Sequence, residues 1–204
     1  RMVSEDIQVS SNILTTKQLT DYQKNLLNNG VSKLRDLPIF IDDQPNTTIT
    51  EIRTKLKRLK QREDIKFAVI DYLQLMSGNK RTQSREQEIS EISRGLKLLA
   101  KELKIPIMAL SQLNRSVETR GGQKIPELSD LRESGSIEQD ADMVMFIHRP
   151  EYYGIEHDED GYSVDGRADL YIRKHRNGKV GMVKTRFEGQ YTAFYDWEQT
   201  EHAF

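Results

Sequence analysis

Four short polar segments could carry chemistry, because each directly follows an apolar run that predicts a β-strand. They are Asp42-Asp43, Asp71, the segment from Ser111 to Arg115, and His148-Arg149. Ligands of open α/β sheets bind beyond the carboxyl ends of parallel strands, so these segments are candidate site residues. A carboxylate placed like Asp71 can hold Mg²⁺ through water beside a nucleotide phosphate, or it can simply cap the next turn. The amide of Gln112 could sense a γ-phosphate or hold a water molecule.

Two further segments carry charges of the kind that contact phosphates. Residues 130–142 are dense in polar side chains and contain a single glycine, Gly135. Backbone N–H groups near Gly135, together with Arg132, would suit the phosphates of a nucleic acid strand, although a loop followed by a helix start is the alternative interpretation. Residues 173–178 place three cations at a predicted hairpin tip. This tip could reach the phosphates held by a neighbouring subunit, or it could be an ordinary basic turn.

The surrounding sequence predicts the elements that would position these segments. Apolar runs predict strands at 38–41, 66–72, 105–110 and 143–147. Helical spacing of apolar residues predicts helices at 15–29, 48–63 and 86–103, with Gly30 as the C-terminal stop of the first. Alternating strands and helices predict an α/β fold with a parallel sheet covered by helices. The continuous apolar run from Phe67 to Ile70 predicts a strand buried on both faces.

The C-terminal part of the chain has a different pattern. Residues 151–166 are acidic and rich in turn formers, which predicts a surface loop. Residues 168–175, 179–187 and 191–197 then alternate apolar and polar side chains. Asn177-Gly178 and Glu188-Gly189 are hairpin signals between them, so an antiparallel meander is expected to close the sheet.

Composition excludes several classes of protein. The 204 residues correspond to one generous domain, and the formal net charge of −1 excludes a uniformly basic nucleic-acid surface. Any DNA contact must then come from a local cluster or from several copies around one strand. The absence of cysteine excludes disulfide scaffolds, cysteine-based zinc sites and thiol catalysis. No apolar run predicts a transmembrane helix or a signal peptide, so a soluble intracellular protein is expected.

Five motifs, taken in order and with their spacing, resemble the DnaB family of bacterial replicative helicases. They lie at residues 67–76, 87–94, 110–115, 130–142 and 174–178. The segment from Asp130 to Asp142 is the most specific of them, and the resemblance runs from Arg1 to about Tyr195.

The resemblance implies a fold and an activity. The fold would be a RecA-like P-loop NTPase core, a largely parallel sheet flanked by helices, with a C-terminal antiparallel meander. The activity would be ATP-driven 5′→3′ movement on single-stranded DNA and duplex unwinding by a homohexameric ring. The resemblance also implies ATP and Mg²⁺ as cofactors, primase and a helicase loader as partners of the full protein, and a place in the bacterial cytoplasm at the replication fork.

The resemblance assigns roles in catalysis to four residues. Asp71 matches the Mg²⁺-associated carboxylate of the Walker B strand, and Gln112 matches the residue that couples the γ-phosphate to the DNA loops. Lys174 and Arg176 match cations that serve the ATP of the adjacent subunit, with Arg176 as the arginine finger. Removal of such a finger typically costs roughly 10³–10⁵ in rate.

The same resemblance assigns three residues to DNA binding. Arg132, Glu133 and Gly135 match the loop that contacts the DNA backbone in the central channel of the ring. A ring also accounts for the near-neutral charge, because several weak loops along one strand bind by multivalency.

One family motif is missing from this sequence. No Gly-x-x-x-x-Gly-Lys-Ser/Thr occurs in the 204 residues, so residues 1–204 are expected to be a partial RecA-like ATPase domain without its phosphate-binding loop. The family's catalytic glutamate and its N-terminal domain, which binds primase, are also expected to be absent. We therefore expect no ATP hydrolysis by this chain alone.

Two other functions compete with the helicase interpretation. The chain could be a non-catalytic DNA-binding or assembly module that keeps the finger and the DNA loop. A RecA-like recombinase relative would fit the fold but not the segment from Asp130 to Asp142.

Overall fold

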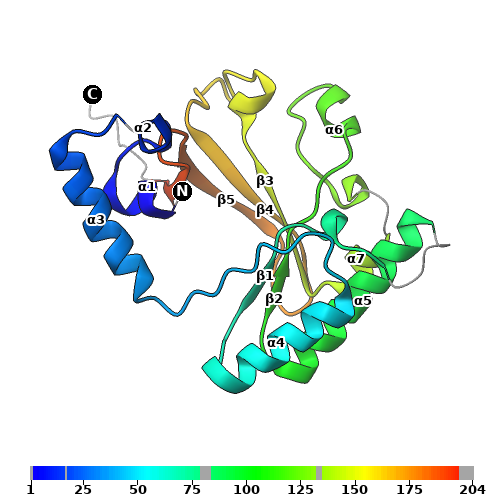
Figure 1. Ribbon diagram of the computed structural model, residues 1–204. Coiled ribbons are helices and arrows are strands. Elements are labelled where there is room, and N and C mark those ends of the chain that lie inside the picture. Colours follow the sequence, from blue (N-terminus) through cyan, green and yellow to red (C-terminus); the bar gives the residue numbers. More distant parts are fainter. Residues whose placement is uncertain (1, 17, 79–83, 132–134, 198–204) are drawn as a thin grey trace. The chain divides into compact units, whose positions relative to one another are not determined.

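The structure is a computed structural model that describes residues 2–16, 18–78, 84–131 and 135–197 (Figure 1). Its helices are α1 (Met2–Ile7), α2 (Ser11–Thr16), α3 (Asp21–Arg35), α4 (Ile49–Glu63), α5 (Arg85–Leu103), α6 (Ser116–Thr119) and α7 (Gly135–Asp140). Its strands are β1 (Ala68–Ile70), β2 (Ile107–Ala109), β3 (Met143–His148), β4 (Arg167–His175), β5 (Gly181–Glu188) and β6 (Ala193–Asp196). In the described part of the chain, no helix combines the length and the apolar character needed to cross a membrane.

The chain divides into two compact units. The first unit contains Arg1–Ile39, Ile147–Tyr171 and Met182–Phe204, and the second contains Phe40–Phe146 and Ile172–Gly181. Asp71, Gln112 and the basic segment 173–178 all belong to the second unit.

The core of the second unit is built on α5. This helix begins at Ser84, whose side chain accepts the N–H of Gln87 while the Gln87 side chain accepts the N–H of Ser84. Its apolar residues recur every three or four positions, so they share one face of the helix. That face supplies the buried residues Ile89, Ile92, Leu96, Leu99 and Leu103. The helix predicted at 86–103 is therefore confirmed, and α4 packs beside it (Figure 1).

Strands β1 and β2 form the parallel pair of the second unit. Ala68 lies opposite Ile107, and Val69 lies opposite Met108. The prediction that this strand is buried on both faces is wrong for the described residues. Val69 is 52% exposed and its partner Met108 is 40% exposed. Only one face of the pair is covered, because the described helices lie against the side that carries Ala68, which is 8% exposed.

The apolar run at 38–41 does not form the predicted strand. The backbone there has no regular secondary structure, and Ile41 is 84% exposed. An apolar run becomes a strand only where a neighbouring strand offers hydrogen-bonding partners, and in the described residues none pairs with it. As a result, Asp42-Asp43 does not follow a strand end.

In the first unit, the predicted helix 15–29 is displaced along the chain. The helix starts at Thr20, which forms a reciprocal cap with Gln23, and it ends after Arg35. Gly30 is not its C-terminal stop but a buried residue within it. A Cβ at this position would overlap the Ile7 side chain, so the glycine allows α1 to approach α3 closely.

The C-terminal strands form the predicted meander, but in the described residues they pair with β3 in a separate sheet and do not extend the parallel pair of β1 and β2. The four-stranded sheet has the order β3-β4-β5-β6, and β5 pairs antiparallel with β6. The pairing places Phe187 opposite Phe194, and their rings lie 4.9 Å apart. The molecule thus combines a helix-covered parallel pair with an antiparallel C-terminal sheet.

Candidate functional site

Asp71 and Ser111-Gln112 lie at the same edge of the parallel pair. The carbonyl of Ile70 accepts the N–H of Leu110 at 2.9 Å, and the carbonyl of Leu110 accepts the N–H of Leu73 at 2.9 Å. Both segments therefore emerge beyond the carboxyl ends of paired strands, as the sequence predicts for a ligand site. The side chains of Asp71 and Gln112 are exposed, so both can reach a ligand.

Gln74 joins the two segments, and the sequence reasoning missed it. Its amide donates to Oγ of Ser111 at 3.1 Å, and its carbonyl oxygen accepts the N–H of Gln112 at 3.2 Å. Gln74 lies in the 3₁₀ turn Leu73–Leu75 that follows β1. An amide in the first turn after a strand is the only sequence signal that could have identified it. The bonds fix the backbone of Gln112 relative to the turn after Asp71.

The residues directly after Gln112 contact the start of the region 130–142. Leu113 forms an antiparallel bridge with Leu131, and the N–H of Asn114 donates to the carbonyl of Asp130 at 2.9 Å. A shift of Gln112 would therefore act on Leu131, one residue before the predicted DNA loop.

Asp130 is the buried anchor of that region. It is 2% exposed, accepts the N–H of Glu127 at 2.8 Å and pairs with Arg120. The hydrogen bond to Asp130 raises the pKa of the Arg120 guanidinium, so the guanidinium stays positively charged. The start of the loop thus rests on a fixed charge pair.

The residues predicted to contact DNA are described only in part. Arg132 and Glu133 lie outside the described residues. Gly135 is the first residue of α7 and is exposed. The Ser136 hydroxyl lies 2.7 Å from that of Ser90, which ties the start of α7 to α5.

Lys174 and Arg176 lie at the other end of α7. The Lys174 ammonium donates to the carbonyl of Glu138, and Nη2 of Arg176 donates to the carbonyl of Gln139 at 2.6 Å. Asp142 lies beside them, with Oδ1 3.8 Å from Nε of Arg176. The structure therefore brings the predicted trans-acting cations to the helix that begins at Gly135.

The other strand-end candidates form contacts within the fold. Asp42 pairs with Lys55 of α4. His148 is 1% exposed, and its ring stacks on Tyr153 at 5.5 Å. The guanidinium of Arg149 lies 4.0 Å from the centre of the Phe187 ring.

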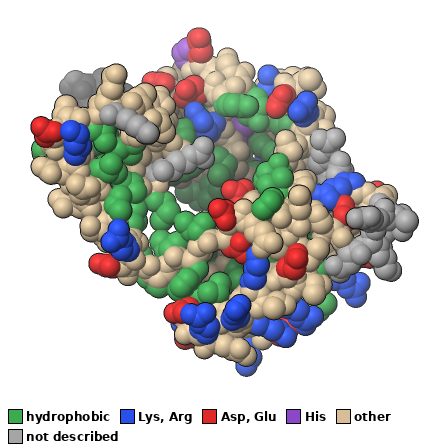
Figure 2. Space-filling model, viewed as in Figure 1, with side chains coloured by type: hydrophobic (Ala, Val, Ile, Leu, Met, Phe, Trp, Pro, Cys, Tyr) green, Lys and Arg blue, Asp and Glu red, His purple; other side chains and the backbone are tan. Residues whose placement is uncertain are grey.

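Lys and Arg side chains also gather over α4 (Figure 2). Carboxylates meet many of these charges: Lys57 pairs with Glu102, and Lys60 pairs with Asp64. Such exposed and neutralised charges fit a solvated outer face.

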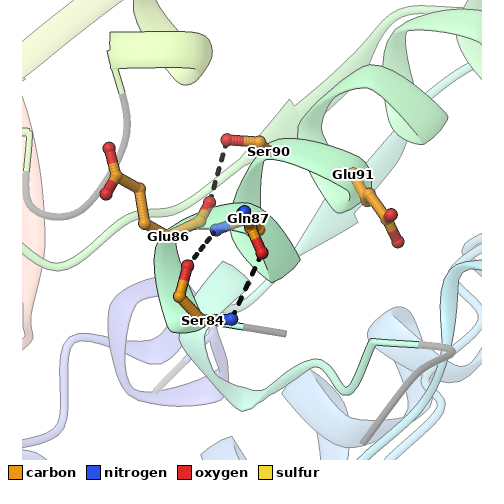
Figure 3. Close-up of a pocket in the computed structure, with 5 residues that line it drawn as sticks. All are labelled: Ser84, Glu86, Gln87, Ser90 and Glu91. Carbon is orange, nitrogen blue, oxygen red and sulfur yellow. Dashed lines mark hydrogen bonds between the residues drawn. The ribbon is translucent and has the colours of Figure 1, made fainter. Parts of the chain in front are cut away.

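A shallow pocket lies at the beginning of α5 (Figure 3). It is lined by Ser84, Glu86, Gln87, Ser90 and Glu91. Two of these described lining residues, Glu86 and Glu91, are carboxylates.

A magnesium ion could be held at Asp71 by one carboxylate. Within the described residues, no group of three or more metal-ligating side chains occurs. Mg²⁺ beside a nucleotide takes most of its ligands from water and phosphate oxygens, so one exposed carboxylate at a strand end fits it.

The sequence matches a known family over nearly its whole length. Residues 1–196 match the family described as DnaB-like helicase C terminal domain. The replicative DNA helicase DnaB of Leifsonia xyli subsp. xyli is 56% identical over 164 residues, which is 80% of this chain and 35% of that protein. The replicative DNA helicase DnaB of Rickettsia prowazekii is 44% identical over 211 residues, 98% of this chain and 43% of that protein. The chain thus spans less than half the length of these relatives.

Two solved structures share the fold. A DnaB-like replicative helicase, described with its interactions with primase, has a TM-score of 0.85 and 32% identity, covering 97% of this chain and 46% of that one. A second structure, a separate ATPase domain, has a TM-score of 0.86 and 32% identity, covering 97% of this chain and 69% of that one. The predicted fold class, a RecA-like ATPase core with a C-terminal antiparallel sheet, is confirmed.

Proposed function

The chain belongs to the family of DnaB-like helicase C-terminal domains, and we propose that it is the C-terminal portion of the ATPase domain of a replicative DNA helicase. In this proposal, ATP hydrolysis drives 5′→3′ movement of a homohexameric ring along single-stranded DNA and unwinds the duplex. Primase and a helicase loader are partners of the complete protein, which works at the replication fork in the cytoplasm.

One observation carries the proposal: hydrogen bonds and a strand bridge join the turn after Asp71 to Leu131, the residue before the predicted DNA loop. Gln74 ties the turn after Asp71 to Gln112, and Leu113 then pairs with Leu131. Nucleotide-driven motion along DNA needs such a connection, because the phosphate and the DNA strand contact different segments.

The proposed roles follow from charge and position. Asp71 would hold Mg²⁺ through water, and the ion would neutralise charge on the phosphates. Gln112 would contact the γ-phosphate and pass its presence or absence to Leu131. Arg176, with Lys174 beside it, would stabilise the charge that develops on the phosphoryl group in the neighbouring subunit.

Hydrolysis also requires a phosphate-binding loop, which the 204 residues do not contain. We therefore propose that residues 1–204 hydrolyse ATP only together with such a loop. A second candidate function is a non-catalytic module that enters a ring and alters it.

The test is a chimera in which residues 1–204 replace the matching segment of the Rickettsia prowazekii helicase, whose match covers 98% of this chain. We expect ATP hydrolysis stimulated by single-stranded DNA, and a drop of at least about 100-fold in kcat for Asp71→Asn, because the metal-associated charge is lost. Lys124→Gln is the control, since this lysine belongs to no proposed site.

Two outcomes would contradict the proposal. Full hydrolysis by the Asp71→Asn chimera would remove the metal role, and robust turnover by residues 1–204 alone would show that the missing loop is not needed. A chimera without ATPase activity that still slows an intact ring when mixed with it would favour the non-catalytic module.

A further inference from the structure

Lys174, near the end of β4, and Arg176, directly after it, bind the C-terminal end of the short helix α7. α7 has only six residues, which is too short for independent stability. The carbonyl of Ile137 accepts the N–H of Ala141, whereas the next two carbonyls, at the C-terminal end, accept side-chain donors. Lys174 supplies one of these donors and Arg176 the other. Both positive charges also oppose the negative end of the helix dipole.

Asp142 is the residue that holds Arg176 in this place. Its backbone carbonyl accepts the N–H of Arg176 at 2.8 Å, and its carboxylate faces Nε of the same residue. Lys97 of α5 donates to the other carboxylate oxygen. The carboxylate is thus fixed from α5 and can orient the guanidinium, whose side chain is 48% exposed.

The electrostatics agree with this geometry. The hydrogen bond from Lys97, and more weakly the charge of Arg176, lower the pKa of the Asp142 carboxyl. The group is therefore a permanent anion at neutral pH, as a residue that orients a guanidinium must be.

We propose that Asp142 is the positioning residue of the Arg176 cation, and that it holds this cation at the C-terminal end of α7, the helix that starts at the predicted DNA loop. The inference rests on the proposed function, in which Arg176 serves the neighbouring nucleotide. It adds a residue outside the family roles assigned above, and it gives the finger a physical link to the loop. Withdrawal of Arg176 from α7 removes a hydrogen-bond donor from the C-terminal end of a short helix, so the position of Arg176 and the stability of α7 are coupled.

The experiment uses the chimera at saturating single-stranded DNA. Asp142→Asn keeps the size of the side chain and removes its charge. We expect kcat to fall about five- to tenfold while KM for ATP stays within twofold, because a misplaced cation loses contact with the transition state rather than with bound ATP. Asp142→Glu restores the charge and should recover most of the rate.

Asp64→Asn is the matched control. The Asp64 carboxylate is 65% exposed against 62% for Asp142, and it also has two cationic partners, Lys60 and Lys66. It has no contact with α7 among the described residues, so kcat should stay within twofold. An equal loss in both variants would overturn the inference, because it would reflect general loss of surface charge.

A double-mutant cycle separates this inference from the proposed function. If Asp142 acts through Arg176, then Asp142→Asn should lower the rate no further in an Arg176→Ala background. A fully active Asp142→Asn chimera, or an additive loss in the double variant, refutes the positioning role. An Arg176→Ala chimera that hydrolyses ATP normally instead refutes the finger role itself, and the inference with it.

Discussion

The buried guanidinium of Arg167 forms ion pairs with two carboxylates. It is 8% exposed, and Nε donates to Asp169 at 2.8 Å while Nη1 donates to Asp158 at 2.9 Å. Asp158 also accepts the backbone N–H of Tyr162, and this bond, with the Arg167 pair, lowers the pKa of its carboxyl. The acidic segment 151–166, which sequence reasoning leaves as a surface loop, is therefore attached to β4 by ion pairs.

This cluster makes the loss of Asp169 strongly destabilising. Asp169 is 2% exposed, and its loss leaves a buried cation with one carboxylate partner. We expect Asp169→Ala to lower the free energy of unfolding by about 3 kcal/mol, as for other buried pairs that lose one member. Urea unfolding at neutral pH measures the difference.

Asp21→Ala is the control, because Asp21 is 94% exposed in its pair with Lys24. This substitution should lower the free energy of unfolding by less than about 1 kcal/mol. Equal costs for the two variants would show that the cluster is not a structural centre.

At the scale of elements, the sequence predicts those helices and strands that combine a clear period with a clear boundary. α4 and α5 each begin at a capping box, at Thr48 and Ser84, and the hairpins of the C-terminal sheet have their turn residues. The prediction for Gly30 is wrong because the sequence alone does not distinguish a glycine needed for close helix packing from a glycine that ends a helix. The contacts of Gln74 could not be predicted, because the role of an amide after a strand depends on partners that only the folded chain brings near it.

The start of α7 offers a test that separates stability from DNA binding. A Cβ at Gly135 would meet no atom within 4 Å, and its φ is not in the left-handed region. We expect Gly135→Ala to raise the free energy of unfolding by about 0.4–1 kcal/mol, because alanine restricts the unfolded chain. If the backbone approaches a DNA strand closely here, the same methyl group should weaken single-strand binding by about tenfold.

Fluorescence anisotropy of a labelled oligonucleotide with the chimera measures the affinity. Gly181→Ala is the matched control, since a Cβ there also meets open space and its φ is likewise ordinary. Its single-strand affinity should not change. If Gly135→Ala also binds normally, the backbone of Gly135 does not lie against DNA.

For the whole molecule, the most consequential feature is an uncovered apolar sheet face in the second unit. Val69 and Met108 lie side by side in the register of β1 and β2, and Phe67 and Leu110 flank them at 49% and 43% exposure. The alternate residues of β1 are less exposed, with Ala68 buried and Ile70 half-buried, so the exposed apolar side chains of β1 lie on one face of the pair. The chain covers 69% of the separately solved ATPase domain, and we expect the remaining part of such a domain to cover this face.

One double substitution should therefore have a small effect on the stability of the isolated chain and a large effect on the stability of the chimera. In the isolated 204-residue chain, Val69→Thr with Met108→Thr should change the free energy of unfolding by less than about 0.5 kcal/mol, because exposed side chains gain little from burial. It should also reduce self-association and the binding of a hydrophobic dye, since a contiguous exposed apolar patch promotes both.

In the chimera, where the remaining residues are present, the same substitutions should cost about 2–4 kcal/mol, because two buried apolar side chains are replaced by shorter polar ones. Dye binding and light scattering, followed by denaturant unfolding of both proteins, measure these effects. Equal costs in the two settings would mean that the rest of the domain does not cover this face.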